Sequence, residues 1–70
     1  LPQPIANGFL FASTISVTMN NANRASVENP SANSLLPSWG RFTINGGGSV
    51  TITFTVNIAT GVLAGTYQNP

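Results

Sequence analysis

The stretch Val50-Thr51-Ile52-Thr53-Phe54-Thr55-Val56-Asn57-Ile58 alternates apolar and polar residues without a break. A period of two places the apolar side chains on one face of an extended strand and the polar side chains on the other. The β-branched and aromatic residues that fill the apolar positions also favour strands. The stretch therefore predicts a long strand with one buried face.

Two further segments show the same period. Residues 9–19 carry five apolar residues in phase, namely Phe9, Phe11, Ile15, Val17 and Met19, and residues 41–44 carry Phe42 and Ile44 in phase. The glycine-rich segment 45–48 is expected to join residues 41–44 to the long strand as a β-hairpin. Because no segment has helical periodicity, the predicted fold class is all-β.

The remaining segments are expected to be less regular. Residues 20–38 are rich in Asn and Ser and contain two prolines, so they are predicted to be a loop with Val27, Leu35 and Leu36 as core anchors. Residues 66–68 are expected to begin another strand. The predicted apolar core consists of Phe9, Phe11, Ile15, Val17, Trp39, Phe42, Ile44, Val50, Ile52, Phe54 and Val56.

Charged side chains are rare, with two Arg and one Glu among 70 residues and no Lys, Asp, His or Cys. This set contains no nucleophile–base pair, no carboxylate pair and no thiol. It also lacks the ligands that zinc and calcium need. We therefore expect no enzyme activity, no catalytic residues, no cofactor and no metal site.

The same composition bears on partners. A net charge of +1 gives no basic patch for nucleic acid. No apolar run approaches the 18 or so residues of a membrane-spanning helix, so no membrane span is expected.

A series of short motifs resembles a known family. These are Leu1-Pro2, Gly8-Phe9, the segment from Pro37 through Trp39-Gly40 to Ile44, the segment Gly47–Val56, and Ala64-Gly65-Thr66-Tyr67 with Asn69. Together they resemble the later part of the immunoglobulin-like repeat known as domain of unknown function 11, which occurs in tandem in bacterial and archaeal cell-surface and secreted proteins. The resemblance implies an immunoglobulin-like β-sandwich and an extracellular or cell-surface location. It carries no catalytic or binding residues to transfer.

The chain departs from that family by having too few strands to close a sandwich of about 100 residues. Residues 1–70 are therefore expected to be a single partial sandwich unit, completed by strands from neighbouring subunits or repeats. The candidate inter-subunit strand is the long uncharged one, through Val50, Ile52, Phe54, Val56 and Ile58. The alternative is that this strand lies in the centre of its own sandwich.

Two hypotheses for function follow. The first is a structural, non-catalytic building block of an extracellular surface protein or filament, whose partners are copies of itself or adjacent repeats. The second is an adhesin or carbohydrate-binding repeat that binds surface glycans through Trp39, Tyr67 or the row Thr51, Thr53 and Thr55. Each of these groups also has a structural explanation, because a lone Trp commonly fills the core and Tyr anchors a strand corner. Thr is likewise common on an exposed strand face. An ice-binding surface on the threonine row is a third, weaker hypothesis.

Overall fold

The computed structural model describes all 70 residues of the chain as one antiparallel hairpin. Strand β1 spans Phe9–Val27 and strand β2 spans Gly40–Ile58. The two strands pair from Phe9 opposite Ile58 to Val27 opposite Gly40. The prediction of an all-β chain is confirmed, but the sheet has two strands and does not form a complete sandwich.

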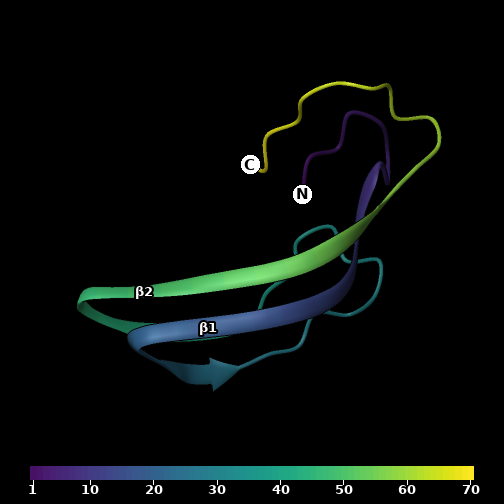
Figure 1. The fold of residues 1–70 in the computed structure, drawn as a ribbon. Coiled ribbons are helices and arrows are strands. Elements are labelled where there is room, and N and C mark those ends of the chain that lie inside the picture. Colours follow the sequence, from purple (N-terminus) through teal and green to yellow (C-terminus); the bar gives the residue numbers. More distant parts are fainter.

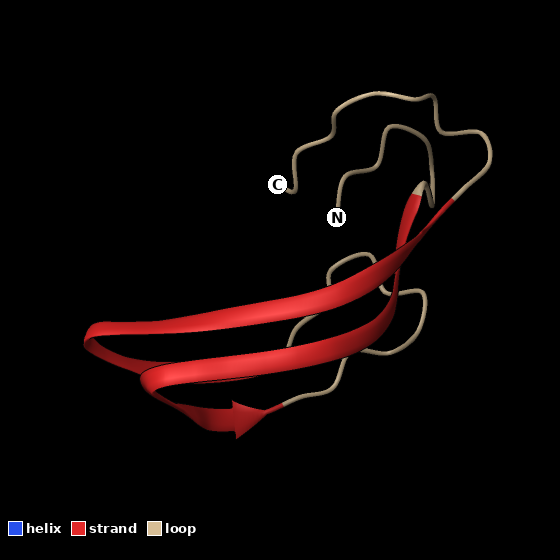
Figure 2. Ribbon diagram, in the orientation of Figure 1, coloured by secondary structure: helices blue, strands red, loops and turns tan.

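Both strands turn back on themselves midway, so the hairpin is folded double (Figures 1 and 2). The long arm consists of residues 9–20 paired with residues 49–58, and the short arm consists of residues 22–27 paired with residues 40–44. The connection between the strands, residues 28–39, contains no strand or helix. Residues 20–27, predicted to be part of a loop, are instead the second half of β1.

The corner between the arms is built by Asn and Gly. β2 places four residues, 45–48, opposite the single residue Asn21 of β1. Asn21 and Gly47 have φ angles of 49° and 78°, a left-handed conformation that Asn and Gly adopt most readily. The side-chain amide of Asn45 donates a 3.0 Å hydrogen bond to Oδ1 of Asn21, which ties the two strands together at the corner.

The predicted hairpin between residues 41–44 and 50–58 is therefore wrong. Both segments belong to β2, and both pair with β1 rather than with each other. The glycines supply the backbone conformation that a tight turn would also need, but they use it for a corner within one strand. Residues 66–68 form no strand, which is a second correction.

Two bulges in the long arm of β1 change which of its residues share a face. The partners jump from Phe11 to Ser13 and from Thr14 to Ser16, while β2 stays continuous, so Ala12 and Ile15 are the extra residues. Thr14 consequently lies opposite Phe54, and Ile15 is 65% exposed. The predicted core position of Ile15 is wrong, because a bulge reverses the alternation on which the prediction rested.

The core of the chain is small. Phe11 is the one buried hydrophobic residue, and along the long arm of β2 the alternate apolar residues from Val50 to Val56 are half-buried while Ile58 is exposed. The Cα radius of gyration is 14.0 Å, whereas a compact domain of this length has about 11 Å. The chain by itself therefore forms an open, elongated hairpin with little enclosed interior.

Several residues predicted to lie in the core are exposed. Ile44 is 51% exposed, Val27 63%, Leu35 40% and Leu36 82%. Val27 ends β1, and Leu35 and Leu36 lie in the connection, where neither arm of the hairpin covers them. A two-stranded sheet has too little surface to bury every apolar residue of its sequence.

Candidate functional site

An aromatic cluster lies between the long arm and the connection. The ring of Trp39 lies 5.9 Å from that of Phe11 and 5.1 Å from that of Phe54, centroid to centroid. Its indole nitrogen donates a 2.8 Å hydrogen bond to the hydroxyl of Thr14. Trp39 is therefore held on both its apolar and its polar side, as expected of a residue that packs a core rather than stacks on a ligand.

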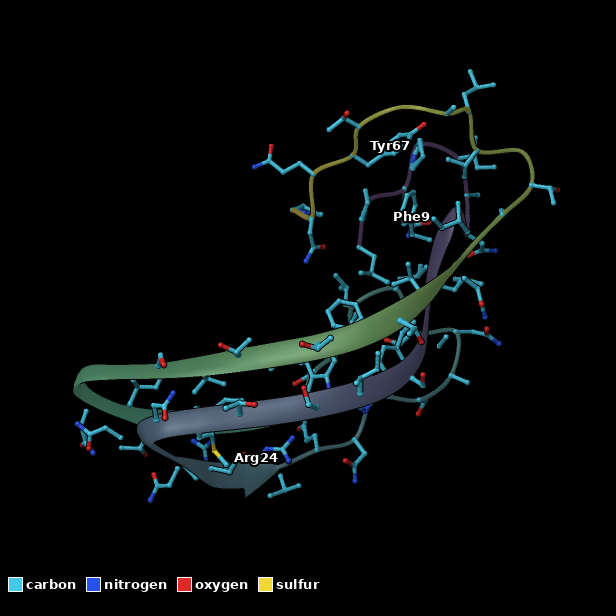
Figure 3. All side chains as sticks on the ribbon, viewed as in Figure 1. Phe9, Arg24 and Tyr67 are labelled. Atoms are coloured by element: carbon cyan, nitrogen blue, oxygen red, sulfur yellow. The ribbon has the colours of Figure 1, made fainter.

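Tyr67 is also engaged within the chain. Its ring meets the ring of Phe9 edge-on at 5.3 Å, and Figure 3 shows the two side chains next to each other at the end of the long arm. Its hydroxyl donates to the carbonyl oxygen of Leu63, four residues upstream. This arrangement fixes the path of the chain after β2. The structure thus places the two aromatic side chains at separate positions and does not join them in one binding surface.

Arg24 fixes both ends of the connection. Its Nη2 donates to the carbonyl oxygens of Trp39, at 2.8 Å, and of Glu28, at 3.3 Å. The guanidinium also lies over the ring of Phe42, 5.5 Å from its centroid. Figure 3 shows Arg24 on the short arm, beside the connection that it holds. The contact of Arg24 with Glu28 thus uses the Glu28 backbone, and no local pattern in the sequence predicts the bond to Trp39.

The outer edge of β2 is the most distinctive feature of the long arm. Phe11 uses its own N–H and C=O for Ser34 and Asn33, so the opposed pair of Phe11 and Val56 forms no hydrogen bond across the hairpin. Because such pairs alternate with bonded ones along a regular strand, every second residue of the long arm of β2 directs its backbone groups away from β1. These residues are Val50, Ile52, Phe54, Val56 and Ile58, the residues of the predicted inter-subunit strand.

Those outward backbone groups have no partner in the chain. No hydrogen bond outside the β1–β2 ladder involves the backbone of residues 49–58. The segment carries no charge and no proline. Natural sheets usually protect an edge with charges, prolines or a covering loop. The outer edge of β2 is therefore open for pairing with another strand.

The outer edge of β1 differs from that of β2. At Phe11 the connection closes it, since the Phe11 N–H donates to the carbonyl oxygen of Ser34 at 3.0 Å and its carbonyl accepts from the Asn33 N–H at 2.8 Å. The bulges at Ala12 and Ile15 then break the regular spacing that an added strand would need. Only β2 presents a regular, unobstructed edge along the long arm.

The outer face of the long arm carries hydroxyl groups on both strands. Three cross-strand pairs contribute them: Ser13 with Thr55, Ser16 with Thr53, and Thr18 with Thr51. All six side chains are exposed, and the hydroxyls of Ser13 and Thr55 bond to each other at 2.7 Å. The sequence predicted the β2 row, whereas the hydroxyls that lie beside it on β1 depend on the strand pairing and its bulges, which the alternation does not show.

A small pocket lies where the two ends of the chain approach the aromatic cluster. Its volume is about 160 Å³, and Trp39, Phe54, Leu1 and Pro70 are among the residues that line it. Pockets for small molecules usually measure about 300–1,000 Å³. The pocket is therefore too small to suggest a site for a sugar or a cofactor.

Comparison with protein-family models, with curated proteins and with solved structures finds no match to this chain. The structure contains no helix of the length and apolarity that would cross a bilayer. Nor does it bring together three or more side chains that would hold a metal ion. The candidate site is accordingly the outer edge of β2, described by its own geometry.

Proposed function

We propose that this chain is a non-catalytic structural building block of an extracellular surface protein or filament. It assembles with like units by pairing strands along the outer edge of β2, and its partners are copies of itself or adjacent repeats. The observation that carries this proposal is the open edge from Val50 to Val56, whose backbone groups have no partner in the chain. Strand addition satisfies such groups and gives affinity through main-chain hydrogen bonds.

The small core supports the same proposal. An isolated two-stranded hairpin is at best marginally stable in water, and this one buries a single hydrophobic side chain, that of Phe11. Strands supplied by neighbouring units would cover the exposed apolar residues and complete an immunoglobulin-like sandwich. The low charge favours such packing, because like units with a formal net charge of +1 repel each other little.

The proposed extracellular location rests on the resemblance to cell-surface repeats. The lack of His, Lys, Asp and Cys leaves no nucleophile–base pair, carboxylate pair or thiol, which supports a non-catalytic role. Residues 1–70 would then act mechanically, as one partial unit of a larger sheet.

A second candidate function, glycan binding, rests on the hydroxyl face rather than on the aromatics. Six exposed hydroxyls on two strands form a neutral surface that could hydrogen-bond the hydroxyls of a surface glycan. Trp39 and Tyr67 contribute less to this function than the sequence suggested, because both are packed and hydrogen-bonded within the chain.

The test of assembly compares two lysine variants by light scattering, with electron microscopy of the same samples. Thr53→Lys places a charge on the β2 edge, and Thr18→Lys places the same charge on the same face of β1. We expect the unmodified chain and Thr18→Lys to form particles larger than one chain, and Thr53→Lys to dissociate. A folded, monomeric unmodified chain would overturn the proposal and leave glycan binding as the better candidate.

A further inference from the structure

The proposed assembly does not specify which strand of a neighbouring unit pairs with the outer edge of β2. The order of residues along β2 indicates which strand it is. The segment 50–56 reads Val-Thr-Ile-Thr-Phe-Thr-Val. It has nearly the same pattern in both directions about Thr53, with Val at both ends, Thr at both second positions, and Ile facing Phe across the centre. A segment of this kind matches an antiparallel copy of itself.

We propose that β2 pairs antiparallel with β2 of a second copy of this chain, about a two-fold axis at Thr53. This inference rests on the proposed function and specifies its partner. The resulting sheet has the strand order β1, β2, β2 of the second copy, β1 of the second copy. A two-fold contact uses the same surface on both units and closes on itself, so a filament would need a second contact elsewhere on the unit.

The backbone geometry agrees with this register. Val50, Ile52, Phe54 and Val56 direct their N–H and C=O groups outward. Centring the pair at Thr53 sets Val50 opposite Val56 and Ile52 opposite Phe54 of the second copy. Each outward group then faces another outward group, which is the condition for a bonded antiparallel pair. Thr53 of one copy lies opposite Thr53 of the other, in a pair without hydrogen bonds, where the side chains approach most closely.

The side chains agree as well. In this register the half-buried apolar residues of both copies lie on one face of the sheet, and the exposed threonines lie on the other. The cross-strand neighbours become Val with Val, Ile with Phe, and Thr with Thr, and aromatic–β-branched and Thr–Thr pairs both stabilise antiparallel sheets. No charge lies within the segment to oppose the pairing.

The alternative partner, β1 of a second copy, fits less well. Its outer edge is occupied at Phe11 by the connection and interrupted by bulges at Ala12 and Ile15. A parallel pairing of two β2 strands would lose the match of Val50 with Val56. Parallel pairs are also slightly less stable per residue. The second copy of β2 in antiparallel orientation is therefore the partner that the edge fits best.

Cysteine cross-linking tests the register directly, because the natural chain contains no Cys. In a non-bonded antiparallel pair the Cα atoms lie about 4.5 Å apart, within the range of a disulfide. Under mild oxidation we expect Thr53→Cys to form a disulfide dimer. Thr51→Cys or Thr55→Cys alone should react slowly, since each would lie roughly 13 Å from its own counterpart. Mixing those two variants should give the mixed dimer, because residue 51 faces residue 55.

We expect Thr53→Cys to form its disulfide dimer roughly tenfold faster or more than Thr51→Cys or Thr55→Cys alone, because pairing raises the local thiol concentration. Light scattering of the reduced variants distinguishes failure of the two-fold register from failure of the proposed assembly. Assembled chains in which Thr53→Cys reacts no faster than the controls would overturn the two-fold register while the proposed function stands. Chains that remain monomeric would overturn both.

Discussion

The indole nitrogen of Trp39 donates a 2.8 Å hydrogen bond to the hydroxyl of Thr14, which precedes it by 25 residues. Thr14 lies on the long arm opposite Phe54, and Trp39 is the last residue before β2. The bond therefore joins the connection to the middle of the long arm. Together with the ring contacts to Phe11 and Phe54, this bond packs Trp39 against the long arm.

Replacing Trp39 is expected to unfold the chain or nearly so. Trp39→Ala removes the ring from the aromatic cluster, a change that typically costs about 3–5 kcal/mol. Trp39→Phe keeps an aromatic ring but loses the hydrogen bond to Thr14, which contributes about 1 kcal/mol. Urea unfolding followed by circular dichroism measures both effects.

Thr14→Val provides the control for the hydrogen bond. In a double-mutant cycle with Trp39→Phe, we expect a coupling energy of about 1 kcal/mol. Additive effects of the two substitutions would show that the bond contributes nothing, and a stable Trp39→Ala variant would favour an exposed, ligand-stacking Trp.

Arg24 is expected to stabilise the connection through the geometry of its hydrogen bonds and not through its charge alone. Arg24→Met preserves much of the apolar contact with Phe42 but removes the bonds to the carbonyl oxygens of Trp39 and Glu28. Hydrogen bonds from charged groups contribute about 1.5–3 kcal/mol, and partial exposure lowers this figure. We expect a loss of about 1–2 kcal/mol in urea unfolding.

Arg24→Lys separates charge from geometry. A single ammonium lacks the planar fork of the guanidinium, so we expect it to recover less than half of the lost stability. Full recovery by Lys would mean that the positive charge, and not the hydrogen-bond geometry, holds the connection in place.

The corner offers a matched pair of glycine substitutions. A Cβ on Gly48 would lie 2.5 Å from the carbonyl oxygen of Asn21 and 2.8 Å from that of Asn20. Because both neighbours are backbone, Gly48→Ala is expected to open the corner and cost about 1–3 kcal/mol, as other overpacked substitutions do. At Gly46 a Cβ meets nothing within 4 Å, so Gly46→Ala should change thermal stability by less than about 1 kcal/mol. Equal effects at the two positions would contradict the folded-back corner.

The strand over residues 50–58 could be predicted from sequence because its alternation is unbroken and its residues favour strands. The bulges at Ala12 and Ile15 left no local sign, so the face of Ile15 was wrongly predicted. The segment Asn45–Gly48 shows the limit of local chemistry. Its Gly47 supplies a left-handed conformation that suits a hairpin turn as well as a corner, and the choice depends on which distant segment pairs with β2.

The candidate edge was likewise only partly visible in the sequence. Its lack of charge and proline pointed to strand pairing, and the same residues form the free edge in the structure. No local pattern predicts that the connection closes the opposite edge at Phe11, because that contact joins residues more than twenty positions apart. This contact and the bulges at Ala12 and Ile15 together leave β2, rather than β1, as the open side of the hairpin.

Amide hydrogen exchange along β2, measured by NMR at low and high chain concentration, tests the central claim most directly. The amides of Thr51, Thr53 and Thr55 face β1 and should be protected at both concentrations. If β2 pairs with another unit, the amides of Val50, Ile52, Phe54 and Val56 should exchange freely in dilute solution and become protected as the concentration rises. Free exchange of these four amides at every concentration, in a chain whose threonine amides stay protected, would show that the edge remains unpaired and would contradict the account.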